Sequence, residues 1–393
     1  MRKVMGRESL ILTLFAGISS VAVSMMLPYI PLFAQESGLS LELIGYVVFT
    51  YYIVQVIMRI PIGSLSDALG DDRIILMGAI SMLISPFFYL LSLRHPASLF
   101  IAQALLGIGH SVTWVTSPSL ITKFRGPLHL YTFFMGLGWF LGPPFGGKLR
   151  DLFGMLPLFI ALFLLSLSSL IFAVILRRRM KVERRVHGIR KIAVLGLKSL
   201  GEALKLMRKR EIFIASYISF IMFMSFGLGA SLLPLYLSEI GLSSFLIGVA
   251  TSVRMGVSTV IRLFTKPLVE SPKRVLILLL CALSTGASIV LVSMTKSFTA
   301  ILILSAIWGL GVGIYLPVVF SIVADSTGES ERGTAMGLRG SMGSLGSAVG
   351  TVAFMHLADA FSISYALLIS GLAILILSIP PILRGLTGRS PML

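Results

Sequence analysis

The sequence predicts an all-α integral membrane protein in which 12 transmembrane helices form two pseudo-symmetric six-helix bundles around a central cavity. Three observations predict this fold. The composition is apolar with few charges, a series of apolar segments has membrane-spanning length, and an internal repeat relates the two halves of the chain.

Composition separates this chain from soluble proteins. Among its 393 residues, the types AVILMFWYC account for 56% and charged residues for 12%, about half the share usual in soluble domains. The net charge is +17, but Lys and Arg lie in short gaps between apolar runs rather than across one folded face, so we expect no nucleic-acid partner. The single cysteine, Cys281, excludes an intrachain disulfide.

Twelve segments are apolar over about 20 residues, the length that crosses a bilayer as a helix. The first resembles a secretory signal, but it has no small-residue cleavage pattern and is interpreted as a membrane span. The expected spans are 9–32, 42–62, 74–93, 98–121, 130–149, 156–176, 212–235, 244–264, 275–294, 299–322, 335–358 and 363–383.

The distribution of basic residues predicts the orientation. With the N-terminus inside, 25 Lys and Arg fall on the cytoplasmic side and only Arg94, Lys148, Arg150 and Lys296 on the other. Under the positive-inside rule this asymmetry predicts a multi-pass protein of the cell membrane with both termini cytoplasmic, its basic side facing anionic lipid headgroups.

The expected domains are a six-helix bundle at 1–176, a basic cytoplasmic linker at 177–211 and a second six-helix bundle at 212–393. Apolar and basic residues alternate with helical spacing in the linker. The linker is either an amphipathic helix on the membrane surface or a solvated connection held inside by its charge.

An internal repeat relates the two halves. Residues 31–45 align with residues 234–248 at an offset of 203, with nine identities in 15 positions. The same offset carries Arg59 onto Arg262. Both copies lie between the first two spans of a half, so the repeat is parallel, as expected where two halves share a central site.

The turn between the second and third spans has the sequence GSLSDALGDDR, beginning at Gly63. It resembles the loop signature of the major facilitator superfamily, a group of membrane transporters. The resemblance implies a conformational latch formed by Gly63, Asp67, Gly70 and Arg73, although alanine replaces the first basic residue of the signature and two aspartates interrupt it. A helix-hairpin turn with a capping Asp67 is the alternative.

The fifth span contains GWFLGPPFGG, in which the matching positions are Gly138, Gly142, Pro143, Gly146 and Gly147. This run is similar to the core motif of the drug and proton antiporter branch of the same superfamily. Glycines four residues apart let helices approach closely, and proline bends a helix. The resemblance implies a pivot or seal between the halves, and ordinary close packing is the alternative.

A third signature of that branch places an arginine in the fourth span, where this sequence has Gln103. The resemblance associates that arginine with proton coupling, so its absence leaves open whether H+ or another ion is coupled. No Asp or Glu falls near the middle of an expected span, and His110 is the alternative titrating group.

By the same resemblance, the first, fourth, seventh and tenth spans surround the cavity, flanked by the second, fifth, eighth and eleventh. Polar and aromatic residues at mid-depth are candidate substrate contacts. They are Arg254, His110, Tyr51, Gln55, Trp114, Trp308 and Tyr315. Arg254 lies near the centre of its span, where it needs a counter-charge or hydrogen-bond acceptors. Helix packing is the alternative for each aromatic residue, and a structural role for Arg254.

The sequence has no phosphate-binding loop, zinc-ligand spacing or nucleophile constellation, so we expect no enzyme, no cofactor and no metal. The resemblance implies a secondary active transporter that works by alternating access, acts as a monomer, and exports small amphipathic or anionic molecules by antiport, as multidrug efflux proteins do. The alternatives are an uptake permease for an organic anion or sugar, and a non-transporting membrane sensor or assembly factor.

Overall fold

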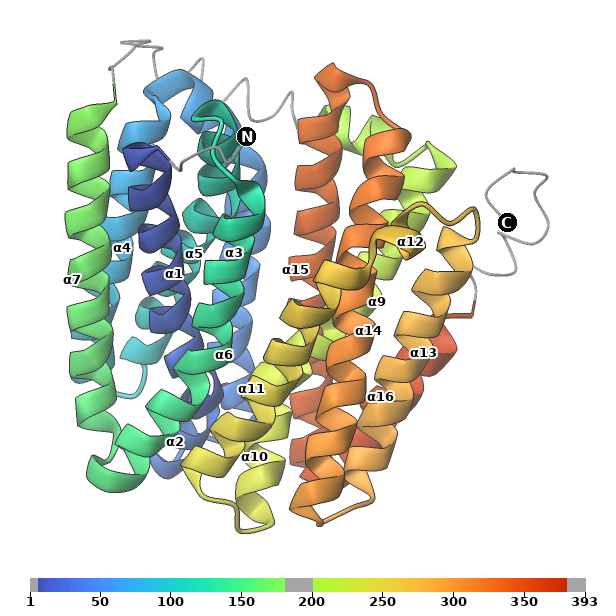
Figure 1. Ribbon diagram of the computed structural model, residues 1–393. Helices are drawn as coiled ribbons and strands as arrows, with labels where there is room; N and C mark the ends of the chain where they lie inside the picture. The colour runs from blue at the N-terminus through green and yellow to red at the C-terminus, as the bar shows by residue number, and fades with distance from the viewer. Residues whose placement is uncertain (1–5, 181–200, 380–393) are drawn as a thin grey trace.

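A computed structural model describes residues 6–180 and 201–379, apart from the side chains at 60, 63, 64, 67, 68, 329 and 330. Every regular element in these ranges is helical (Figure 1). The first half contains α1 (Arg7–Met26), η1 (Leu27–Tyr29), α2 (Ile30–Glu36), α3 (Leu41–Leu69), α4 (Asp71–Leu91), α5 (Ser98–Lys123), α6 (Leu128–Phe153) and α7 (Met155–Arg179). The second half contains α9 (Arg210–Ala230), α10 (Leu232–Glu239), α11 (Ser244–Ile261), η2 (Arg262–Phe264), α12 (Lys266–Val269), α13 (Arg274–Ser293), α14 (Phe298–Asp325), α15 (Glu329–Ala360) and α16 (Ile363–Leu377).

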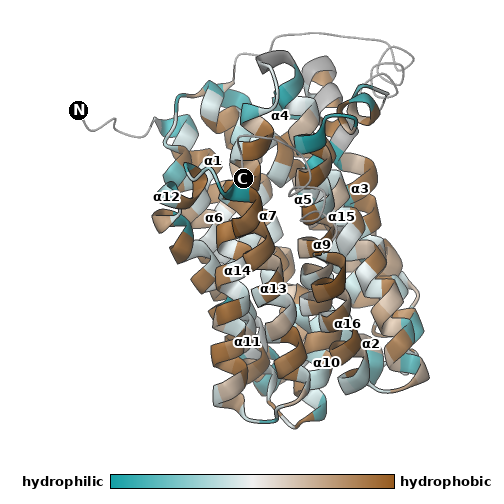
Figure 2. Ribbon diagram, turned by 90° about the vertical axis from the view of Figure 1, so that its right-hand side faces the viewer, coloured by the Kyte–Doolittle hydropathy of each residue, from teal (hydrophilic) through white to brown (hydrophobic). Residues whose placement is uncertain are grey.

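The helices agree with the twelve predicted spans. Within the described residues, nine helices are long and apolar enough to cross a membrane. The shorter apolar helix α16 and the long helices α6 and α15 coincide with the other three predicted spans. Hydrophobic residues run along the helices, and hydrophilic residues gather toward their ends (Figure 2). The corrections concern boundaries, such as the start of α15 at Glu329 instead of residue 335.

The first and seventh spans are interrupted at equivalent places. α1 passes through η1 into α2, and α9 gives way to α10 at Ser231. Pro31 near the start of α2 and Pro234 near the start of α10 are related by the 203-residue offset. Because proline donates no backbone hydrogen bond, both helices deviate at the same depth, which supports the repeat.

The helices form two bundles, α1 to α7 and α9 to α16, which lie side by side (Figure 1). Two seams join the bundles, α6 against α11 and α3 against α15. The repeat relates these seams, because its offset carries the second span onto the eighth and the fifth onto the eleventh. The boundaries predicted for the bundles and the linker stay predictions, since residues 181–200 lie outside the described ranges.

The two ends of the molecule are named here by residues. The Glu36 end contains the ends of α2 and α10, and the Arg7 end contains the start of α1 and the end of α14 (Figure 1). Several polar contacts join the bundles at the Glu36 end. Tyr29 Oη donates to Ser244 O at 3.1 Å, Arg150 Nη1 donates to Ser244 Oγ at 2.6 Å, and His356 Nε2 lies 3.1 Å from Glu42 Oε1. These contacts hold that end closed.

Candidate substrate site

Arg254 is buried at the middle of α11, ten residues after its first residue, Ser244. Its guanidinium carbon lies 4.4 Å from the ring centroid of Trp308 on α14, a cation–π geometry. On the other side the guanidinium lies against Gly229 of α9, where an added Cβ would come within 1.8 Å of Arg254 Nη1. The missing side chain at Gly229 therefore makes the space that the arginine fills.

The charge of Arg254 has no anionic partner among the described residues. Its Nε is buried without a hydrogen bond, and its guanidinium forms no hydrogen bond or ion pair with a described residue. A small pocket beside it is lined by Phe226, Met255, Trp308 and Val312. These side chains nearly fill the pocket in this conformation. All of these side chains belong to α9, α11 and α14, so in this conformation the second bundle leaves no room for an anion beside Arg254.

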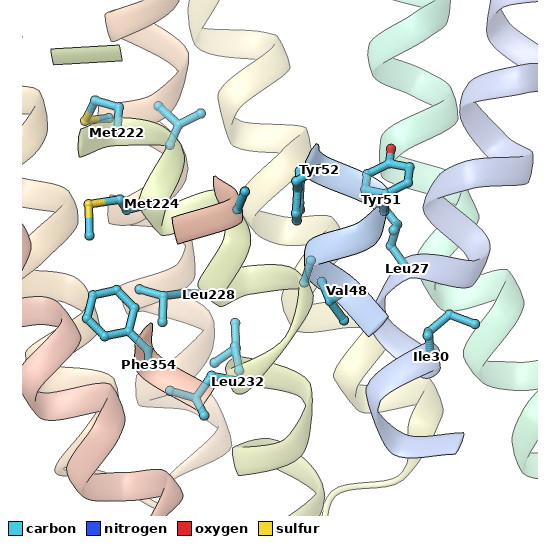
Figure 3. Close-up of a cluster of buried hydrophobic side chains, with 14 of the residues drawn as sticks. Leu27, Ile30, Val48, Tyr51, Tyr52, Met222, Met224, Leu228, Leu232 and Phe354 are labelled. Atoms are coloured by element: carbon cyan, nitrogen blue, oxygen red, sulfur yellow. The ribbon is translucent and has the colours of Figure 1, made fainter. Parts of the chain in front are cut away.

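The first bundle closes over this region through α3. Tyr52 Oη donates to Phe226 O on α9 at 3.4 Å, next to the pocket. Figure 3 shows Val48 and Tyr52 of α3 in the same buried cluster as Leu228 of α9 and Leu232 of α10. This apolar contact between bundles separates the pocket of Arg254 from the closed Glu36 end.

Three predicted site residues form a second cluster in the first bundle. Trp114 Nε1 donates to His110 Nε2 at 2.5 Å, and His110 Nδ1 lies 2.5 Å from Tyr51 Oη. Because Nε2 accepts a hydrogen bond, the proton of a neutral imidazole is on Nδ1 and is donated to Tyr51. Trp139 lies against His110, with ring centroids 5.7 Å apart. Both nitrogens of His110 are therefore occupied, and a further proton would displace Trp114.

The remaining predicted cavity residues contact their own surroundings. Trp308 Nε1 donates to Ser225 Oγ at 3.2 Å, and Tyr315 Oη donates to Ser219 Oγ at 2.6 Å. Gln55 accepts a hydrogen bond from Arg59 at 2.7 Å. The candidates therefore form two clusters, one around His110 with Tyr51 and Trp114 and one of Arg254 with Trp308. Gln55 and Tyr315 lie outside both clusters.

The glycine motif of α6 lies where three helices meet. An added Cβ at Gly138, Gly142 or Gly146 would come within 3 Å of α1 atoms, and one at Gly147 would lie 2.3 Å from Ser244 O of α11. Pro143 O accepts a hydrogen bond from Tyr29 at 2.5 Å. The motif therefore packs α6 against α1 along most of its length and against the other bundle at the Glu36 end.

In the predicted latch, Gly70 has a positive φ of 95°, which a residue without Cβ adopts readily. The two aspartates that interrupt the family signature form ion pairs within the first bundle. Asp71 Oδ2 lies 2.5 Å from Lys123 Nζ, and Asp72 Oδ2 lies 3.5 Å from Arg177 Nε. Arg73 forms no ion pair with a described residue. The structure does not describe the surroundings of Gly63 or the side chain of Asp67, so their role in a latch stays a prediction.

Comparison with known proteins decides the family. The family model of the Major Facilitator Superfamily matches residues 12–294 and 217–391. The chain belongs to this superfamily. The major facilitator superfamily consists of transporters rather than enzymes, and membership confirms the resemblance noted from the loop and helix motifs.

One relative of the chain within the major facilitator superfamily is the multidrug resistance protein MdtG of Escherichia coli (strain 55989 / EAEC). The two are 28% identical over 160 residues, so the alignment spans only 39% of this chain and 39% of the relative.

Two solved structures share the fold over nearly the whole chain. A POT family transporter in complex with 5-aminolevulinic acid has a TM-score of 0.78 at 13% identity, with 97% of this chain and 96% of that chain covered. The human organic anion transporter MFSD10 (TETRAN) has a TM-score of 0.67 at 17% identity, with 95% and 99% covered. At these identities the likeness concerns the major facilitator fold alone.

Some residues of the site carried no signal in the sequence. Gly229 is one of 38 glycines, and nothing in its neighbours indicates that it touches Arg254. Trp139 lies within the glycine motif, but the motif does not specify its contact with His110. Asp151, which joins the bundles, is a single acid at the end of α6. Only the pairing of helices in space shows what these residues contact.

Proposed function

We propose that this protein is a secondary transporter that exports small amphipathic or anionic molecules by alternating access, through a site at which Arg254 binds an anionic group. One observation carries the proposal: a buried arginine at the middle of a membrane helix faces a pocket without any described counter-charge. The similarity of part of the chain to a multidrug resistance protein supports export.

The energetics favour an anion at Arg254. An arginine at the centre of a membrane helix costs about 2.5–3.5 kcal/mol on insertion scales. A desolvated cation–π contact such as that with Trp308 offsets about 2 kcal/mol of this cost. Since the guanidinium donates no hydrogen bond to a described residue, most of its donors are available to a carboxylate, sulfonate or phosphate of the substrate.

Flux in proteoliposomes tests this role. We expect the wild-type protein to transport carboxyfluorescein, an organic anion, in preference to rhodamine 6G, a cation, or radiolabelled glucose. Arg254→Gln should lower anion flux at least about tenfold, because it removes a charged donor, and Arg254→Lys should lower it less, because it keeps the charge but loses the planar fork. If Arg254→Gln bound the anion with unchanged affinity, Arg254 would not be part of the binding site.

Gly229→Ala provides an independent variant. The added methyl group occupies the place of Arg254 Nη1, so it should displace the guanidinium without removing the charge. Its anion flux should fall as in Arg254→Gln, and the double variant should be no worse than either single one, because coupled sites are not additive. Direction is measured in the same vesicles, where net uptake from the outer face would identify a permease instead of an exporter.

We also propose that the Arg7 end faces the cytoplasm, in the cell membrane, and that the Glu36 end faces outward. A cysteine at Ser199, in the basic segment outside the described residues, tests this in a Cys281→Ser background. Because the surrounding basic charges resist translocation, we expect an impermeant maleimide to label it only from the cytoplasmic side. Labelling of intact cells from outside would reverse the orientation.

A further inference from the structure

Arg59 lies on α3 at the seam with α15. Its Nη1 donates to Gly340 O across the seam at 2.9 Å, and its Nη2 donates to Gln55 Oε1 at 2.7 Å, whereas its Nε is buried without a partner. Among the described residues the arginine therefore has two neutral acceptors and no anionic one.

Arg339 precedes Gly340 on α15 and is 7% exposed. Its guanidinium carbon lies 4.5 Å from the centroid of the Phe320 ring, and its Nη1 donates one long hydrogen bond to Tyr315 Oη, at 3.4 Å. Its Nε is buried and has no partner. Most of its donors are unused among the described residues.

Arg59 Nη1 donates to the carbonyl of the residue that follows Arg339, so the two cations occupy neighbouring positions at one seam. No described carboxylate forms an ion pair with either of them: Asp325 pairs with Arg274, and Asp71 with Lys123. Two like charges away from water, without a counter-ion, destabilise the protein that contains them. Such an arrangement favours the binding of an anion, which satisfies both guanidinium groups at once.

The internal repeat provides a comparison within the chain. Arg262 is equivalent to Arg59 and makes the equivalent bond, from Nη2 to Ser258 Oγ four residues earlier, at 3.2 Å. The position equivalent to Arg339 is Gly136, on α6, where an added Cβ would meet Thr259. The second cation therefore occurs at only one of the two related seams, so helix packing in the fold does not by itself require it.

We propose that Arg59 and Arg339 form a second anion-binding position, which takes a second acidic group of the substrate. Tyr52 lies between the two positions, because it is two helical turns before Arg59 on α3 and its hydroxyl donates to Phe226 O, beside the pocket of Arg254. The proposal rests on the proposed function and narrows its substrate class to organic dianions with two separated acidic groups. A substrate that enters from the Arg7 end reaches Arg59 and Arg339 before Arg254.

Binding of two matched probes tests the pair. The full chain is placed in phosphatidylcholine nanodiscs at constant ionic strength, and its affinity is measured for naphthalene-1-sulfonate and for naphthalene-1,5-disulfonate. We expect the disulfonate to bind at least about tenfold more tightly, since it gains charge-assisted hydrogen bonds. Arg59→Gln and Arg339→Gln should each reduce this preference to about twofold or less and leave monosulfonate binding unchanged. Arg262→Gln, at the related seam, should keep the preference.

Thermal unfolding distinguishes a binding role of Arg59 and Arg339 from a purely structural role. In the absence of probe, Arg339→Gln should unfold at the same temperature as wild type or higher, because it removes a like-charge pair. A lower unfolding temperature together with an unchanged disulfonate preference would make the arginines structural braces and overturn the proposal. If the preference persists in both variants while Arg254→Gln loses monosulfonate binding, the proposed function stands and the second position is wrong. If the wild-type protein binds neither probe, both the proposed function and the second anion-binding position are wrong.

Discussion

Gly142→Leu is expected to abolish transport and lower the unfolding temperature, while the protein still inserts into the membrane. An added Cβ at Gly142 would lie 2.0 Å from Ser24 Oγ, 2.9 Å from Met25 N and 2.9 Å from Val21 O. The serine hydroxyl could rotate away, but the two backbone atoms could move only with α1. Overpacking of this kind costs about 1–3 kcal/mol, and a leucine must in addition displace the whole helix.

The protein provides its own reporter for this experiment. Cys281 is the only cysteine and is buried, so a maleimide dye that fluoresces on reaction follows unfolding. Gly337→Leu is the matched control, because Gly337 also lies within a long helix but an added Cβ there meets no atom within 4 Å. Wild-type flux and unfolding temperature in Gly142→Leu would refute a role of this glycine in packing the two helices and in transport.

The fold could be predicted from the sequence because its determinants are local or repeated. Each span needs only enough apolar residues to cross the bilayer, and the aligned prolines Pro31 and Pro234 mark the same helix break in both halves. The helix boundaries were harder to predict from the sequence. α15 begins at Glu329, before residue 335, and runs through Gly333, because helices continue past the apolar core into polar sequence.

The candidate site could be predicted from the sequence only in part. The depth of Arg254 follows from its position in a span, but its contact with Trp308 and Gly229 depends on how α9, α11 and α14 pack. The sequence indicates His110 as a titratable group, but in the structure both of its ring nitrogens have hydrogen-bond partners. The neighbours of a side chain come from distant parts of the chain, which residue type and spacing do not specify.

Asp151 closes the Glu36 end by a contact that resembles a helix cap between bundles. Its two carboxylate oxygens accept hydrogen bonds from Ser244 N and Phe245 N, both at 2.8 Å, at the start of α11. A carboxylate at a helix N-terminus satisfies free N–H groups and interacts favourably with the helix dipole, effects of about 1–2 kcal/mol. Because α6 and α11 belong to different bundles, this stabilisation is lost whenever the end opens.

Asp151→Asn should therefore shift the protein toward a conformation that is open at the Glu36 end, by about 5–30-fold in the ratio of the two states, since an amide offers one acceptor and no charge. Spin labels at Leu156 and Phe361, exposed residues at this end of the two bundles, measure the separation by pulsed electron resonance in a Cys281→Ser background. We expect a longer distance to gain population. Asp359→Asn, an exposed acid at the same end without a described ion pair, should leave the distribution unchanged. Identical distributions in both variants would mean that the apolar contacts between α3 and α9 close this end without help from Asp151.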